Sequence, residues 1–152
     1  MLFLKTSDEA LLGVIPFDAE HMREIAMVNL IHASIEAGVR EATLRNLVQG
    51  LLRQTQCRFA QEHLLMKRVA YPAADRHRRS HHEIIHTLEQ MWTDADLAGN
   101  SAADAARRVI EDGASLIREH MQAEDRPLAG YLESRPRVVR PATTSRRAPH
   151  RR

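Results

Sequence analysis

The stretch EATLRNLVQGLLRQTQCRFAQEHLLMKRV, residues 41–69, decides the fold class of this chain. Alternating steps of four and three residues along it meet Leu44, Val48, Leu51, Thr55, Arg58, Glu62, Leu65 and Val69. Apolar residues at this spacing form one face of an α-helix, so we predict a helix over residues 41–69. The helix should end before Tyr71-Pro72, because proline disfavours helical geometry in the residue before it.

Three other segments show the same helical spacing, at about residues 18–37, 73–98 and 101–127. Gly38 follows the first segment as a C-terminal glycine, and Ser101 opens the last as an N-cap residue. Strand-like alternation of apolar and polar residues is missing throughout. Because the connections are short, we predict an all-α fold, an antiparallel up-down-up-down four-helix bundle.

The two ends of the sequence differ from this periodic part. Residues 135–152 contain seven arginines and no acidic residue, whereas residues 1–134 carry 15 basic and 20 acidic side chains. We therefore predict a bundle domain over residues 1–134 and a disordered basic tail over residues 135–152. The tail is expected to be mainly solubilising, with weak contact to an anionic partner as the alternative. Residues 1–17 are expected to form an arm that packs along the bundle.

The composition also bears on the compartment. The only cysteine, Cys57, excludes an intramolecular disulfide and is typical of a reducing compartment. No apolar run is long enough to span a membrane, and the N-terminus lacks the apolar middle of a secretory signal. We therefore expect a cytoplasmic protein.

Polar side chains occupy positions on the helix faces that should be apolar. The first face reads His21, Ile25, Val28 and Ile35, the third His77, His81, Ile84 and Leu88, and the fourth Val109, Gly113, Leu116, His120 and Ala123. Buried polar groups cost free energy unless they are paired or bind a metal. In an antiparallel bundle six of them meet at one end, and imidazoles with carboxylates suit iron, zinc or manganese. The predicted metal ligands are His21, Glu62, His77, His81, His120 and Asp125.

One spacing does not fit a regular helix. Asp125 follows His120 by five residues, which would turn its carboxylate away from the buried face. We therefore expect the helix to loosen there into a π-like turn. The other histidines on these helices and Cys57 lie on other faces or several turns away, so we expect structural or surface roles for His32, Cys57, His63, His82 and His86.

These residues resemble the hemerythrin family, including its single-domain bacterial members. The similarity covers roughly residues 3–131 and rests on GVIPFDAEH at 13–21, FAQE at 59–62, Leu65-Met66, Tyr71-Pro72, His77, His81, His120 and Asp125. The resemblance implies two irons that reversibly bind dioxygen. His77, His81 and His120 would hold one iron, His21 would contribute to the other, and Glu62 and Asp125 would bridge the pair.

The chain departs from the family pattern at one ligand position. The family has a histidine four residues before the bridging glutamate, where this chain has Arg58. Arginine stays protonated and does not ligate metals. The site could therefore keep two metals with the second more weakly held, keep one metal in the three-histidine half with Arg58 paired to Glu62 or Asp125, or be empty.

Several functions follow from this reading. The leading hypothesis is a non-haem iron protein that binds dioxygen or a related small ligand for storage, delivery or sensing, and we favour binding over catalysis. An oxidase-like or peroxidase-like enzyme at an open iron site is the first alternative. A metal-depleted bundle that acts as an interaction module is the second.

Overall fold

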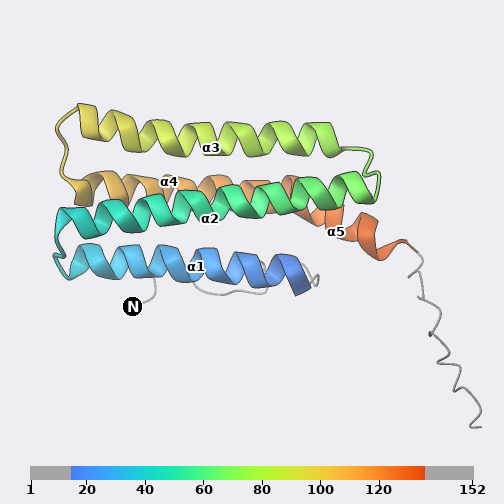
Figure 1. Cartoon of the computed structure of the whole chain (residues 1–152), viewed down its shortest axis with the longest axis horizontal. Coiled ribbons are helices and arrows are strands. Elements are labelled where there is room, and N and C mark those ends of the chain that lie inside the picture. The colour runs from blue at the N-terminus through green and yellow to red at the C-terminus, as the bar shows by residue number, and fades with distance from the viewer. Residues whose placement is uncertain (1–14, 136–152) are drawn as a thin grey trace, which may run out of the picture.

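The computed structural model describes residues 15–135 of the chain, and this part is almost entirely helical (Figure 1). The elements are α1 Ile15–Glu36, α2 Glu41–Arg68, α3 Ala74–Leu97, α4 Ala102–His120, the π-helix η2 Met121–Asp125 and α5 Arg126–Glu133. The last three follow one another without a break. Helices α1 to α4 lie side by side and alternate in direction, which confirms the predicted all-α four-helix bundle.

The antiparallel arrangement brings four helix ends together. The start of α1, the end of α2, the start of α3 and the end of α4 lie at the same end of the bundle (Figure 1). Helix α5 continues past that end. Residues that are 40 or more positions apart in the sequence can therefore share one buried site.

Local sequence signals set the helix boundaries. Gly38 follows α1 with a φ of 63°, and its N–H donates to the carbonyl of Ile35 at 3.0 Å, as expected for a C-terminal glycine. The Ser101 side chain accepts a hydrogen bond from the N–H of Asp104 at 3.1 Å, which confirms it as the N-cap of α4. Helix α1 begins at Ile15, three residues before the predicted start.

Parts of the predicted arm and tail lie outside the described residues. Residues 15–17 of the expected arm belong to α1, whereas residues 1–14 are not described. The structure likewise does not describe residues 136–152, so the disorder of the basic tail stays a prediction.

Two apolar clusters flank the polar end of the bundle. The larger draws residues from all four helices of the bundle and includes Ile31, Val48 and Val109, each no more than 1% exposed. The smaller consists of Met66, Tyr71 and Leu128. Helix α5 closes over this smaller cluster, where the Tyr131 hydroxyl donates to the carbonyls of Val69 and Ala70, both at 3.1 Å. The polar side chains between the clusters are therefore shielded from water.

The predicted buried faces are correct over most of their length and wrong at their ends. On α2 the buried residue after Glu62 is Met66, while Leu65 and Val69 are only partly buried. Six turns of 3.6 residues advance about 22 positions, from Leu44 to Met66, whereas the alternating walk reaches only Leu65. The helix pitch thus explains the difference.

Of the helices in the described part of the chain, none has the length and apolar character needed to cross a membrane.

Candidate metal centre

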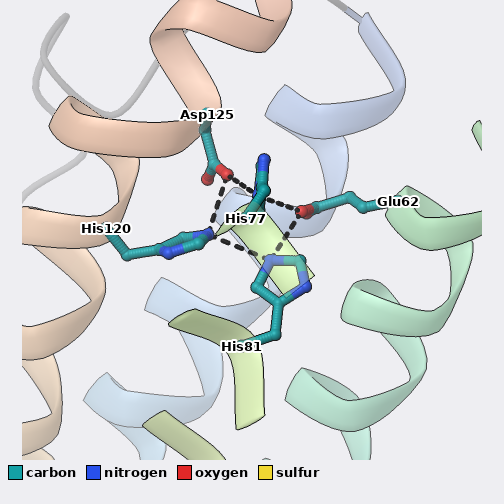
Figure 2. A group of neighbouring side chains, drawn as sticks. All are labelled: Glu62, His77, His81, His120 and Asp125. Carbon is teal, nitrogen blue, oxygen red and sulfur yellow. Dashed lines mark hydrogen bonds and ion pairs between the residues drawn. The ribbon is translucent and has the colours of Figure 1, made fainter. Parts of the chain in front are cut away.

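Three histidines and two carboxylates meet at the polar end of the bundle (Figure 2). Glu62 comes from α2, His77 and His81 from successive turns of α3, His120 from the last turn of α4, and Asp125 from η2. Each side chain is at most 3% exposed. One ligand atom from each lies within 4.8 Å of all the others, so the group could hold a metal ion.

The distances inside this histidine–carboxylate cluster are those of ligands around one ion. His81 Nε2 lies 3.0 Å from His120 Nε2 and 3.1 Å from Glu62 Oε2. Asp125 Oδ1 lies 2.9 Å from His120 Nε2 and 3.1 Å from His77 Nε2. Donors held about 2.1 Å from one ion at right angles are about 3 Å apart. The cluster therefore has the dimensions of a metal-binding site.

Hydrogen bonding supports the same reading. Among the described residues, Glu62 Oε2, His77 Nε2 and both Asp125 carboxylate oxygens are buried without a hydrogen-bond partner. Buried polar atoms are rarely left in this state, because each costs free energy. A metal ion would satisfy these atoms together, and imidazole with carboxylate is a donor set that iron, zinc and manganese accept.

Two histidines are oriented from outside the cluster. His120 Nδ1 lies 2.9 Å from the Ser80 hydroxyl, and His81 Nδ1 lies 2.9 Å from His63 Nε2. Phe59 stacks on the His81 ring at a centroid distance of 3.6 Å. Such contacts leave the Nε2 atoms facing the cluster and fix the ring planes. His63 thus has the structural role expected of it, and Ser80 is a partner that the sequence analysis did not identify.

The π-helix η2 places Asp125 in the site and confirms the predicted π-like turn. The wider turn rotates Glu124 and Asp125 inward, so both are buried. Ala123, which regular helical spacing placed on the buried face, is exposed instead. Glu124 is anchored by an ion pair with Arg76 of α3 at 3.0 Å.

The Arg58 guanidinium lies on the other side of the two carboxylates. Its Nη1 is 2.8 Å from Glu62 Oε1 and 3.6 Å from Asp125 Oδ2. The same atom is 3.4 Å from His21 Nε2, which in turn is 3.3 Å from Asp125 Oδ2. The structure therefore brings His21 beside Arg58 and not into the histidine–carboxylate cluster.

Glu24 completes the surroundings of Arg58 and was missed by the sequence analysis. Its Oε2 lies 3.1 Å from Arg58 Nε, and the side chain is buried. The predicted face of the first helix ran from His21 to Ile25, but Glu24 is buried there and Ile25 is only partly buried. The signal available in the sequence was the three-residue spacing from His21, which also keeps two side chains on one helix face.

The carboxylates hold Arg58 in its charged form. Burial alone would lower the pKa of Arg58, but the attraction of Glu24, Glu62 and Asp125 outweighs burial and raises that pKa above its ordinary value. Burial likewise acts to raise the pKa of Glu62, yet contacts with His77, His81 and Arg58 lower it to about 2. Arg58 and Glu62 thus form a fully ionised buried pair.

The histidines of the cluster differ in proton affinity. Burial lowers the pKa of His81 to about 4 despite its contact with Glu62. For His77, the effect of burial is overcome by its contacts with Asp125 and Glu62, which raise the pKa to about 9. Burial would raise the pKa of Asp125, but contacts with His120, His21 and His77 hold it well below its ordinary value.

A cavity of about 320 Å³ adjoins this region between α1 and α2. Its lining includes the buried Arg58 and Glu62, together with Glu20 of α1 and Arg68 of α2. The cavity lies on the Arg58 side of the carboxylates, and none of the three cluster histidines lines it.

The fold and the site define a class of protein, a four-helix bundle with a buried histidine–carboxylate site suited to a metal ion. The chain belongs to the hemerythrin family, because the family description "Hemerythrin HHE cation binding domain" matches residues 13–132. This confirms the resemblance stated from the sequence. The family assignment supports non-haem iron as the metal.

The chain is also similar to two curated bacterial proteins. It is 23% identical over 134 residues to "Bacteriohemerythrin" of Stenotrophomonas maltophilia (strain R551-3), an alignment that covers 88% of this chain and 84% of that protein. It is 24% identical over 134 residues to "Bacteriohemerythrin" of Pseudomonas paraeruginosa (strain DSM 24068 / PA7), with 88% and 82% covered. No solved structure shows a significant match to the chain.

Proposed function

We propose that this chain is a non-haem iron protein that holds one iron ion per chain and binds dioxygen or a related small ligand for storage, delivery or sensing. His77, His81, His120, Glu62 and Asp125 are the proposed ligands. The ion would supply a redox-active centre with an open position for the small ligand. We further propose, from the single cysteine, that the protein is cytoplasmic.

The observation that carries the single-metal proposal is the position of Arg58. The resemblance implied a second iron shared by His21, Glu62 and Asp125. In the structure Arg58 Nη1 lies within 3.6 Å of an atom of each of these residues. A guanidinium and a metal ion cannot share that volume, and their like charges would repel.

Charge balance supports the same count. Glu24, Glu62 and Asp125 carry three negative charges, and Arg58 carries one positive charge. One ferrous ion brings the buried group to neutrality when its histidines are uncharged. A second ferrous ion would leave two uncompensated positive charges in a water-poor interior, which is costly.

Elemental analysis after anaerobic loading with ferrous iron tests the proposal. We expect one iron per wild-type chain, and an Arg58→His variant should gain iron, because it restores a neutral donor beside His21. An Arg53→His variant, which changes an exposed position on α2, is the matched control and should bind as wild type.

Two results would contradict the proposal. Two irons in the wild type would mean that Arg58 moves aside for a second ion. No iron would favour the metal-depleted interaction module. If one iron binds, persistence of an oxygenated spectrum supports ligand binding, whereas turnover of peroxide supports the enzyme alternative.

A further inference from the structure

Two histidines outside the buried cluster lie together on the exposed side of α3. His82 and His86 are four residues apart, so they lie one helical turn apart on the same face of the helix. Both side chains are exposed. Within the described part of the chain neither forms a hydrogen bond or an ion pair, and His82 contacts the His63 ring of α2 at a centroid distance of 6.2 Å. Both imidazoles are therefore available to a ligand from solvent.

The spacing of this exposed histidine pair suits a metal ion. Side chains four residues apart on a helix have Cβ atoms about 5–6 Å apart. Because imidazole nitrogens bind Zn²⁺ at about 2.0–2.1 Å, two histidines on adjacent turns can reach one ion. His77 and His81 of the buried cluster have the same spacing, and their ring centroids are 4.5 Å apart. Helix α3 thus carries a second pair of imidazoles in the same relation, turned about 100° toward solvent.

Carboxylates next to the exposed pair favour a cation. Glu83 precedes His86 by three residues and Glu89 follows it by three, and both side chains are exposed. Residues three apart are neighbours on the surface of a helix. An ion held by His86 is therefore close to two negative charges.

Two arginines one turn before His82 act against a cation, but acidic side chains offset part of their charge. Arg78 Nη2 lies 3.4 Å from the carboxylate of Asp75. Arg79 precedes Glu83 by four residues, which places the two charges on the same side of the helix. In addition, the exposed position lets solvent screen the remaining repulsion.

The donor set indicates which ions fit. Two imidazoles with water in the other positions suit late first-row divalent ions, whereas Mg²⁺ and Ca²⁺ prefer oxygen ligands. We propose that His82 and His86 bind one Zn²⁺, Ni²⁺ or Cu²⁺ ion in a second, solvent-exposed site. This site does not depend on the proposed function of the buried cluster. Ferrous iron is bound more weakly than these ions, so the exposed pair should not add to the iron content.

Retention on immobilised Ni²⁺–iminodiacetate tests this site separately from the cluster. An ion fixed to a resin can meet exposed histidines, but it cannot enter a cluster whose side chains are at most 3% exposed. We expect wild type to be retained. Affinity should fall about ten- to a hundredfold in His82→Gln and in His86→Gln, because each leaves one imidazole where two acted together. His150→Gln, which removes a histidine elsewhere in the chain, is the control and should change affinity less than threefold.

Thermal unfolding in excess soluble Ni²⁺–iminodiacetate shows whether the two histidines bind as a pair. The pair exists only while α3 is helical, so the chelate binds the folded chain in preference to the unfolded chain and stabilises it. A single histidine binds the chelate in both states. The unfolding temperature should therefore rise in wild type and His150→Gln, and stay unchanged in His82→Gln and His86→Gln.

The contrary outcomes are distinct. Wild type that elutes like both single variants overturns the exposed site, and so does an equal loss in His150→Gln. Retention without a rise in the unfolding temperature also overturns it, because the histidines would then bind singly. Iron content is measured on the same samples, so protein that binds nickel through the pair but takes up no iron overturns the proposed function alone.

Discussion

The buried carboxylates Glu62 and Asp125 have different partners on their two sides. On one side their oxygens meet three imidazoles whose Nε2 atoms converge at metal-ligand spacing. On the other side the same carboxylates meet a guanidinium. A carboxylate buried in a bundle needs a positive partner, and either a metal ion or an arginine can supply it.

The difference lies in what each partner permits. A metal ion can exchange ligands and change its oxidation state. A guanidinium has a fixed charge, forms no coordinate bond to a ligand and is covalently part of α2. Arg58 is therefore a permanent structural cation on its side of the carboxylates, whereas the histidine side could hold an exchangeable metal ion.

The largest expected effect comes from removing this resident cation. Arg58→Met leaves Glu24 and Glu62 as buried charges without their partner, and the protein should lose about 3–5 kcal/mol of unfolding free energy. Denaturant unfolding with metal removed measures it. The exposed Arg53→Met on the same helix should cost less than about 0.5 kcal/mol. A loss below about 1 kcal/mol for Arg58→Met would mean that the Arg58 side does not need its cation.

The histidine side should respond through metal affinity. His63→Ala and Ser80→Ala each remove the outer partner of a proposed ligand, and iron affinity should fall about 10- to 100-fold. Competition with a metal chelator measures it, and the exposed His86→Ala on α3 is the control. Unchanged affinity in both variants would show that packing alone, including the Phe59 ring on His81, orients the histidines.

The pH dependence of the metal-free protein should come from two histidines that act in separate pH ranges. The pKa of His77 is raised to about 9, so its contribution to stability is complete below about pH 6.5 and is lost as pH rises through 9. The pKa of His81 is lowered to about 4, so stability falls as pH drops from about 6.5 to 4, where only the unfolded chain takes up the proton.

Thermal unfolding between pH 4 and 9 should therefore show a maximum near pH 6.5. A His77→Gln variant should lose the decline toward pH 9 and keep the decline toward pH 4. A decline toward pH 9 that persists in His77→Gln would assign it to other groups.

The smallest expected effect concerns helix α5, which follows Asp125 in the chain. Tyr131→Phe removes the hydroxyl that donates to Val69 and Ala70, and the unfolding free energy should fall by about 1 kcal/mol. Iron affinity should change little, because no proposed ligand contacts this hydroxyl. A tenfold loss of iron in Tyr131→Phe would mean that α5 positions Asp125.

Most of the fold could be predicted from the sequence, because helical periodicity and capping are local. The spacing around Val48 and the signals at Gly38 and Ser101 predicted four helices, and the ends of the first three lie within three residues of those in the structure. The fourth was expected to end near Pro127, but the helical run continues through η2 and α5 to Glu133. The five-residue step from His120 to Asp125 gave the π-helix, since only a wider turn lets both side chains face inward.

Five of the six predicted ligands lie together in the structure, whereas His21 lies beside Arg58. The helix faces placed His21, Glu62 and the three cluster histidines at one end of the bundle, but periodicity does not fix the distances between helices. The separation of His21 from the cluster, and the burial of Glu24 against Arg58, depend on how α1 packs on α2.

The sequence by itself thus determined the helices, the end of the bundle that is polar and the presence of Arg58 on the buried face of α2, because each follows from the spacing within single segments. Only the tertiary structure decided where the guanidinium lies and which carboxylates balance it. Those outcomes depend on contacts between α1, α2, α4 and η2. A buried charge is stable only where side chains from several helices together offset the free-energy cost of its desolvation.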